Sequence, residues 1–170
     1  MKLSEMFQQE IEQVKSERKA ILTEIKENGG YGSPASLLNR GRLDELDEKE
    51  RDLNVKIYIE RNRELDVGDG CTCYLWSDSY ACTVIKKTKK TITIQRDKAK
   101  LSPDFKPEWI PGGFAAHCTN AEEQSYTYER NPNGEIYVCH WSEKEGRYRT
   151  GSDGSIKIGV GRHEYYDYNF

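Results

Sequence analysis

The chain lacks the motifs that mark common catalytic and nucleotide-hydrolysing sites. It has no GxxxxGK[ST] phosphate loop, no GxSxG nucleophile turn and no HExxH helix. Asp97, Asp153 and Asp167 lie near expected strand ends, but their spacing does not mark a pair of carboxylates for acid–base catalysis. Because no segment supplies a catalytic set, we expect a binding protein rather than an enzyme, with no cofactor.

Long apolar runs and a strong net charge are also missing. Hydrophobic residues make up only 35% of the chain, and no stretch approaches the roughly 20 apolar residues of a membrane-spanning helix. Residues 1–13 have no apolar core of signal-peptide length. Residues 1–66 carry 12 basic and 15 acidic side chains, and residues 67–170 carry 14 of each. We therefore expect neither membrane insertion nor bulk electrostatic binding of nucleic acid.

The five cysteines are odd in number and all lie after Gly68. Together with the missing signal peptide, they predict reduced thiols in a cytoplasmic protein. Two chemical alternatives stay open: a metal site, although CxxC pairs are missing, and a thiol nucleophile at Cys118 beside His117. Buried free cysteines are the favoured interpretation. The candidate metal ligands are Cys71, Cys73, Cys118 and Cys139, with His117 and His140.

The character of the sequence changes near Gly68. Before it, residues 3–27 carry apolar side chains at alternating four- and three-residue spacing, and a second helix is expected from about Leu43 to Leu65. After it, short aromatic and β-branched runs are separated by turn residues. These patterns predict an α+β protein, with an antiparallel helical hairpin over residues 1–66. An antiparallel β-meander or small barrel follows over residues 67–170.

The helical hairpin is also the expected oligomerisation element. Each helix of an isolated pair buries only one face, so we expect self-association into a homodimer or a higher homo-oligomer. The alternative is a hairpin that packs only on its own β-domain.

Eight strands are expected after Gly68, with one long insertion between the third and the fourth. The insertion, residues 99–124, contains Phe105, Trp109, Ile110 and Phe114, which we expect to be kept from solvent. The expected strands are residues 71–76, 80–86, 91–97, 125–130, 135–142, 147–151, 156–160 and 164–170.

Two segments of the sequence carry candidate binding residues. Residues 29–42 are read as a glycine-rich connection that offers arginine and backbone N–H groups to an anion; the alternative is a short helix with solvated arginines. In the second half, seven of the eleven tyrosines lie beyond residue 125 beside several arginines, and aromatic rings with guanidinium groups suit bases and phosphates. The predicted ligand-binding residues are Tyr31, Arg40, Arg42, Arg96, Phe114, His117, Asn120 and Arg162.

Several segments of the second half resemble a group of small phage-encoded proteins of unassigned role. They are GDGCTCYLWSDSYACTVI at 68–85, TITIQRDKA at 91–99, GGF at 112–114 with His117, and GRHEYYDYNF at 161–170. The whole arrangement, a long helical hairpin with a linking arginine before a β-domain, is similar to the Thoeris anti-defence family of phage sponge proteins.

That resemblance implies a cytoplasmic, oligomeric protein that sequesters a nucleotide-derived immune signal without cleaving it. The signal would be cyclic ADP-ribose-like or a cyclic oligonucleotide, with Arg40 or Arg42 as a phosphate contact. Two alternatives remain: a phage inhibitor that binds a host defence protein such as a CRISPR effector, and a metal- or cysteine-dependent hydrolase.

Overall fold

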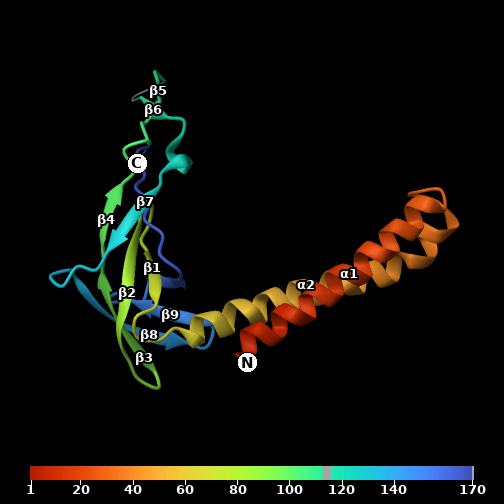
Figure 1. Cartoon of the computed structure of the whole chain (residues 1–170), viewed down its shortest axis with the longest axis horizontal. Helices are drawn as coiled ribbons and strands as arrows, with labels where there is room; N and C mark the ends of the chain where they lie inside the picture. The colour runs from red at the N-terminus through yellow and green to blue at the C-terminus, as the bar shows by residue number, and fades with distance from the viewer. Residues whose placement is uncertain (113–115, 170) are drawn as a thin grey trace. The chain divides into compact units, whose positions relative to one another are not determined.

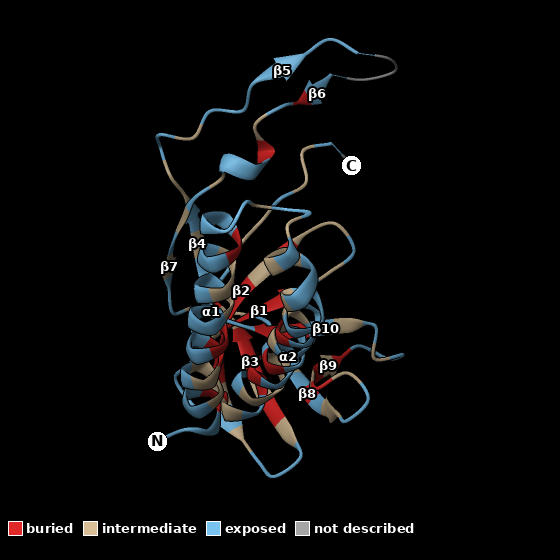
Figure 2. Cartoon of the chain, turned by 90° about the vertical axis from the view of Figure 1, so that its right-hand side faces the viewer, coloured by how far each residue is buried: buried red, intermediate tan, exposed pale blue. Residues whose placement is uncertain are grey.

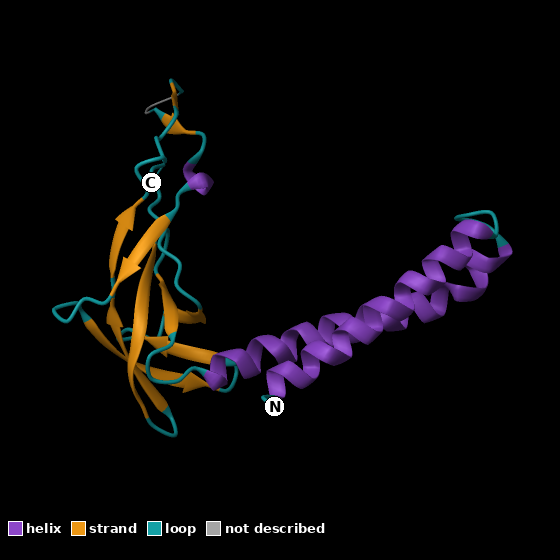
Figure 3. Ribbon diagram, in the orientation of Figure 1, coloured by secondary structure: helices purple, strands orange, loops and turns teal. Residues whose placement is uncertain are grey.

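The structure is a computed structural model that describes residues 1–112 and 116–169. The chain divides into two compact units, Met1–Arg61 and Asn62–Phe170. Two long helices come first and short antiparallel strands follow, so the α+β prediction is confirmed (Figure 1; Figure 3). No helix in the described part of the chain combines the length and apolar content needed to cross a lipid bilayer.

The first unit is an antiparallel pair formed by α1 (Leu3–Glu27) and all but the last three residues of α2 (Pro34–Glu64). Arg18 occupies the one polar position of the α1 seam, and its Nε lies 2.8 Å from a carboxylate oxygen of Asp47 on α2. Lys49 on α2 pairs in the same way with Glu10, at 2.9 Å. The seam is built as its spacing predicts, from Ile11, Val14, Leu46, Leu53 and Ile57, with Phe7 and Ile21 packed against them.

The connection between the helices is shorter than the sequence predicts. Helix α2 begins at Pro34 rather than near Leu43, because Pro34 has the fixed φ that suits a first helical position. The Oγ atom of Ser33 accepts a hydrogen bond from the backbone N–H of Ser36 at 3.2 Å, as a helix cap does. Arg40 and Arg42 therefore project from a helix, and the prediction that they lie in a glycine-rich loop is wrong.

The second unit contains a closed six-stranded antiparallel barrel. Its order is β1-β2-β3-β8-β9-β10, and β10 pairs back with β1. The pairing of β3 with β8 joins segments that the long insertion separates in sequence. The strands are β1 (Gly70–Tyr74), β2 (Ser79–Lys87), β3 (Thr91–Arg96), β8 (Ile136–Ser142), β9 (Arg147–Thr150) and β10 (Ile156–Val160).

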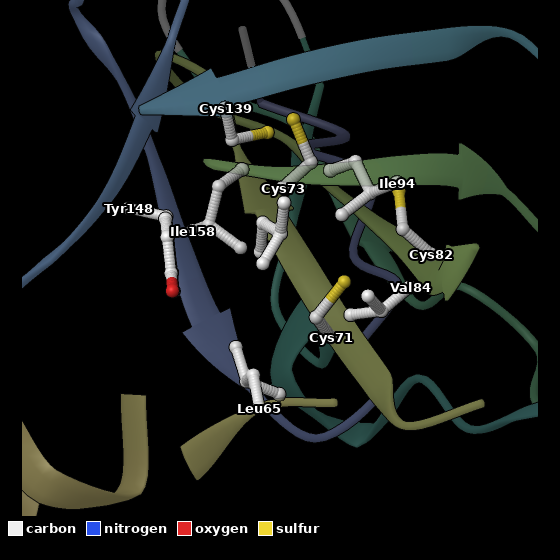
Figure 4. Packing of buried hydrophobic residues seen from close by; sticks show 10 residues of the cluster. Leu65, Cys71, Cys73, Cys82, Val84, Ile94, Cys139, Tyr148 and Ile158 are labelled. Atoms are coloured by element: carbon white, nitrogen blue, oxygen red, sulfur yellow. The ribbon is translucent and has the colours of Figure 1, made fainter. Parts of the chain in front are cut away.

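The interior of the barrel is filled by small and β-branched side chains at alternate strand positions. Figure 2 shows this burial running through β1, β2 and β3, and Figure 4 shows four thiols pointing into the same core. The core consists of Leu65, Cys71, Cys73, Cys82, Val84, Ile92, Ile94, Cys139, Tyr148 and Ile158.

The insertion between β3 and β8 forms two small ribbons. β4 (Lys98–Leu101) pairs with β7 (Tyr126–Glu129), β5 (Trp109–Ile110) pairs with β6 (His117–Cys118), and a 3₁₀ turn, η1, spans Ala121–Glu123.

Two sequence predictions fail in these outer segments. Trp109 is 47% and Ile110 is 52% exposed, because among the described residues β5 pairs with the short β6 alone. Phe105 is half-buried and its ring lies beside that of Tyr168, whereas Phe114 lies outside the described residues. The expected last strand, 164–170, is reduced in its described part to an isolated bridge between Tyr165 and Ser79.

Candidate functional site

One candidate site is an open aromatic cleft of about 270 Å³ in the second unit, beside the connection between β1 and β2. A second cleft of the same unit, of about 370 Å³, lies in the insertion and is lined by Phe105 and Asn120, but it holds no exposed tryptophan. Trp76 lies in that connection and is 95% exposed. A tryptophan side chain that the fold leaves almost entirely in solvent is typical of a recognition surface. The rings that line the cleft are Tyr74, Trp76, His163 and Tyr165, and its carboxylates are Asp78 and Glu122.

The short β1–β2 connection positions Trp76. The backbone N–H of Leu75 donates to the carbonyl of Asp78 at 2.9 Å, which closes the hairpin turn around Trp76 and Ser77. Tyr74 is the last residue of β1, where strand alternation turns its side chain outward, opposite to the buried Cys73. The turn and the alternation together bring two aromatic rings to one edge of the barrel.

The other wall of the cleft comes from the C-terminal segment 161–165, which is fastened to β1 and β2. The N–H of Gly161 donates to the carbonyl of Gly70 at 3.0 Å, and the Thr72 hydroxyl donates to the carbonyl of Gly161 at 2.6 Å. Ser79 and Tyr165 exchange two backbone hydrogen bonds, each 3.0 Å. This ladder carries His163 and Tyr165 to the cleft.

The imidazole of His163 is held on two sides. Its Nδ1 is 3.0 Å from the Oγ of Ser79, and its ring stacks nearly parallel on Tyr165, with centroids 6.4 Å apart. Burial, followed by the charge of Glu122, raises the pKa of Tyr165, so its phenol stays a neutral donor or acceptor. Ser79 is only 4% exposed. The Ser79–His163 contact therefore orients a ring wall and does not present a nucleophile to solvent.

A buried ion pair anchors the same C-terminal segment. The Asp97 side chain is 1% exposed, and its Oδ2 accepts a hydrogen bond from Arg162 Nε at 2.7 Å. The hydroxyl of Thr83 donates to the same carboxylate and accepts from Arg162 Nη2 at 2.7 Å. Gly70 leaves room for this arginine, since a Cβ at position 70 would lie 2.7 Å from Arg162 Cγ. Arg162, predicted to bind a ligand, thus has an anchoring role.

The other predicted residues of the second unit do not line the aromatic cleft. The Arg96 guanidinium lies over the Tyr80 ring, 3.6 Å from its centroid, and pairs with Glu164 at 3.4 Å. His117 is exposed on β6. The Asn120 side chain accepts from the N–H of Glu108 at 2.8 Å and so fixes the insertion.

Three predicted residues belong to the unit Met1–Arg61. Tyr31 is 87% exposed and Arg40 is also exposed. Arg42 donates to Glu17 at 2.6 Å and to Glu45 at 3.0 Å, and these hydrogen bonds raise its pKa. The donors of Arg42 are thus engaged within the hairpin, whereas those of Arg40 face solvent. Ligand contact by these three residues stays a prediction.

The cysteines are buried and free of disulfide bonds. Burial raises the pKa of Cys73 to about 11 and of Cys139 to about 12, and it raises those of Cys71 and Cys82 as well. A thiol that stays protonated at neutral pH is a poor nucleophile. Within residues 1–112 and 116–169, no group of three or more His, Cys, Asp or Glu side chains is arranged to hold a metal ion.

Comparisons of the chain with protein-family models, with curated proteins and with solved structures give no match. The geometry of the aromatic cleft therefore carries the functional conclusion. Its residues were missed at the sequence level, with one signal available: Trp76 stands in a tight connection between two apolar strands, where turn-forming polar residues are usual. His163 and Tyr165 gave no comparable signal, because only closure of the barrel brings them to Trp76.

Proposed function

We propose that this chain is a binding protein that captures a small nucleotide-derived ligand and releases it unchanged. The aromatic cleft carries the proposal. A base that stacks on the exposed rings of Tyr74 and Trp76 gains about 1–3 kcal/mol per stacked ring. The carboxylates of Asp78 and Glu122 accept hydrogen bonds from ribose hydroxyls or base amino groups.

The chemistry of the cleft favours retention over turnover. Its one hydroxyl–imidazole pair is nearly closed to solvent, since Ser79 is 4% exposed. The thiols of the barrel core are protonated at neutral pH, because burial raises their pKa. A site of rings and carboxylates can bind by stacking and hydrogen bonding, and it needs no reactive group for that purpose.

The biological setting that we propose is phage counter-defence in the host cytoplasm. The protein would sequester a cyclic ADP-ribose-like or cyclic oligonucleotide signal, for which nanomolar affinity corresponds to about −12 kcal/mol. Self-association through the hairpin is part of this proposal. Its support is that Leu3, Met6 and Val55 are between 44% and 57% exposed on α1 and α2.

A second candidate function uses the same tryptophan. An exposed aromatic side chain on a fixed turn is also a typical anchor for a protein partner. Trp76, at 95% exposure, would then insert into a pocket of a host defence protein, and the phage protein would act as an inhibitor. This candidate is favoured if no nucleotide stabilises the protein against thermal unfolding.

The experiment is a capture-and-release assay. The protein is incubated with cyclic ADP-ribose isomers and cyclic dinucleotides, freed of unbound ligand, heated, and its supernatant is analysed by chromatography and mass spectrometry. We expect one compound to be retained and recovered intact. Trp76→Ala should abolish retention, whereas Trp109→Ala, which removes a half-exposed tryptophan outside the cleft, should preserve it. A cleaved product, or equal retention by both variants, would refute the proposal.

A further inference from the structure

The outer face of the barrel carries a continuous cross-strand row that begins at the aromatic cleft. Tyr74 on β1 is directly opposite Lys157 on β10, and Lys157 is directly opposite Arg149 on β9. Arg149 is in turn opposite His140 on β8. These four side chains alternate along their strands with residues that face the core, so all four point outward. The inward neighbours are Cys73, Ile158, Tyr148 and Cys139.

The basic members of this row are only partly neutralised by the protein. Like charges placed directly opposite on neighbouring strands are unfavourable, and Lys157 faces Arg149 in this way. Nη1 of Arg149 pairs with Glu145. Asp153 is a further nearby carboxylate: hydrogen bonds from Ser155, and to a smaller extent the charge of Arg149, lower its pKa.

Two further observations indicate that this row could bind an anion. The Arg149 side chain is 28% exposed, so part of it stays open to solvent beside its pairing with Glu145. Lys157 and His140 are exposed at either side of it. A partly exposed guanidinium between two exposed basic side chains is suited to a phosphate group, which offers several acceptor oxygens.

We propose that Lys157, Arg149 and His140 form a phosphate-binding row that continues from the aromatic cleft, an inference that rests on the proposed function. The ring of a nucleotide lies in the cleft and its phosphates lie on the row. Directly opposed Cα atoms are about 5 Å apart, so Lys157 is about 5 Å and Arg149 about 10 Å from Tyr74 along the sheet.

The size of the cleft agrees with this division of the ligand. Its volume of about 270 Å³ is below the roughly 300 Å³ at which pockets begin to enclose whole drug-sized ligands. It has room for a ring and part of a sugar, and it is lined by carboxylates that repel phosphate. A nucleotide held there must place its phosphates outside the cleft. The basic row begins at Lys157, directly opposite Tyr74, and is therefore the outer surface next to the cleft.

The test compares adenosine with ADP-ribose, two probes that share a ring and differ in their phosphates. Binding is measured by titration calorimetry with wild-type protein, Lys157→Ala, Arg149→Gln and Lys98→Ala. Lys157 is exposed, so its removal leaves the fold intact. The matched control is Lys98, an exposed lysine on β4 outside the row. ADP-ribose should bind at least about tenfold more tightly than adenosine, as expected for added charge-assisted hydrogen bonds.

Lys157→Ala and Arg149→Gln should remove most of that difference and leave the affinity for adenosine unchanged, whereas Lys98→Ala should change neither. Glu145→Ala should strengthen ADP-ribose binding, because it removes the acceptor of Nη1 of Arg149 and a neighbouring negative charge. If adenosine binds but ADP-ribose binds no more tightly, or if the Lys157 and Arg149 variants behave like Lys98→Ala, the proposed phosphate row is wrong. The aromatic cleft then remains the proposed site for the ring. If neither probe binds, both the row and its nucleotide ligand are rejected.

Discussion

The ring of Tyr74 lies against Gly159 on the neighbouring strand β10. A Cβ atom at position 159 would be 2.7 Å from Cε2 of Tyr74. Gly159 is opposite Thr72, so it occupies the outward position diagonal to Tyr74 on the barrel surface. Because Gly159 has no side chain, the Tyr74 ring can lie over it. The position of this ring in turn sets one wall of the aromatic cleft.

Gly159→Ala should weaken ligand binding without unfolding the barrel. The added methyl group displaces the end of a flexible side chain rather than backbone, so the cost in stability should stay within about 1 kcal/mol. Loss of one stacking ring should lower the affinity for adenosine by up to about tenfold. Calorimetry and urea unfolding provide the two measurements. The matched control is Gly41→Ala, where a Cβ meets nothing within 4 Å; equal affinities for the two variants would remove Tyr74 from the site.

Arg162→Ala should destabilise the second unit. It leaves the Asp97 carboxylate buried with the Thr83 hydroxyl and with Arg130, whose Nε is 3.8 Å away. Removing one partner of a buried ion pair costs several kcal/mol, and we expect about 2–3 kcal/mol because the Arg162 side chain is 31% exposed.

The control for this prediction is Arg130→Ala, which removes a half-exposed and more distant arginine and should cost less than about 1 kcal/mol. Urea denaturation curves followed by tryptophan fluorescence give both values. If Arg162→Ala unfolds at the same urea concentration as Arg130→Ala, the anchoring role of Arg162 is wrong.

Stability should fall in alkaline solution because of the barrel thiols. Burial raises the pKa of Cys73 to about 11 and that of Cys139 to about 12, whereas an unfolded cysteine titrates near about 8.5. A pKa raised by folding means that the stabilisation is complete below about pH 8.5 and is lost as the pH rises toward these values. The free energy of unfolding should thus be level from pH 7 to 8 and decline above.

Cys139→Ala serves as the comparison for the alkaline decline. It should lower stability at pH 7 by deleting a core side chain, and it should flatten the slope above about pH 8.5 by removing one titrating thiol. Lysines and tyrosines titrate alike in both proteins, so the difference isolates the thiol. Identical slopes would mean that Cys139 does not titrate differently on folding.

The hairpin arginines should have little effect on the barrel site. Arg42 already donates to Glu17 and Glu45, and the cleft is lined by residues of the second unit. The double variant Arg40→Ala/Arg42→Ala should therefore bind ADP-ribose within about twofold of wild type in the calorimetric assay, a change that is small on the scale of hydrogen bonds to charged groups. A loss of affinity of more than tenfold would mean that the ligand binds at the hairpin arginines instead of the cleft.

The sequence predicts the core of each unit better than it predicts the site. Four–three spacing identified Ile11 and Val14 as seam residues, because helix periodicity is a local property. Spacing does not predict the first turns of α2, because Gly32 and Gly41 favour a loop locally, whereas Ser33 and Pro34 start the helix.

The residues of the aromatic cleft could not be predicted from the sequence, because contacts between distant segments bring them together. Tyr74 and Tyr165 are far apart in sequence and line the same cleft only because Tyr165 bridges to Ser79 and the C-terminal segment is tied to β1. Arg162 was predicted to contact a ligand. Its partner Asp97 is distant in sequence, so local spacing does not reveal that this arginine anchors the C-terminal segment. Burial and long-range pairing decide such roles, and neither is a property of local spacing.

A crystal structure of the protein soaked with ADP-ribose would show directly where a nucleotide binds and whether it stays intact. We expect an intact ligand with its ring against Tyr74 and Trp76, and its phosphates on Lys157 and Arg149. A cleaved ligand, or density on Arg40 with the cleft left empty, would contradict it.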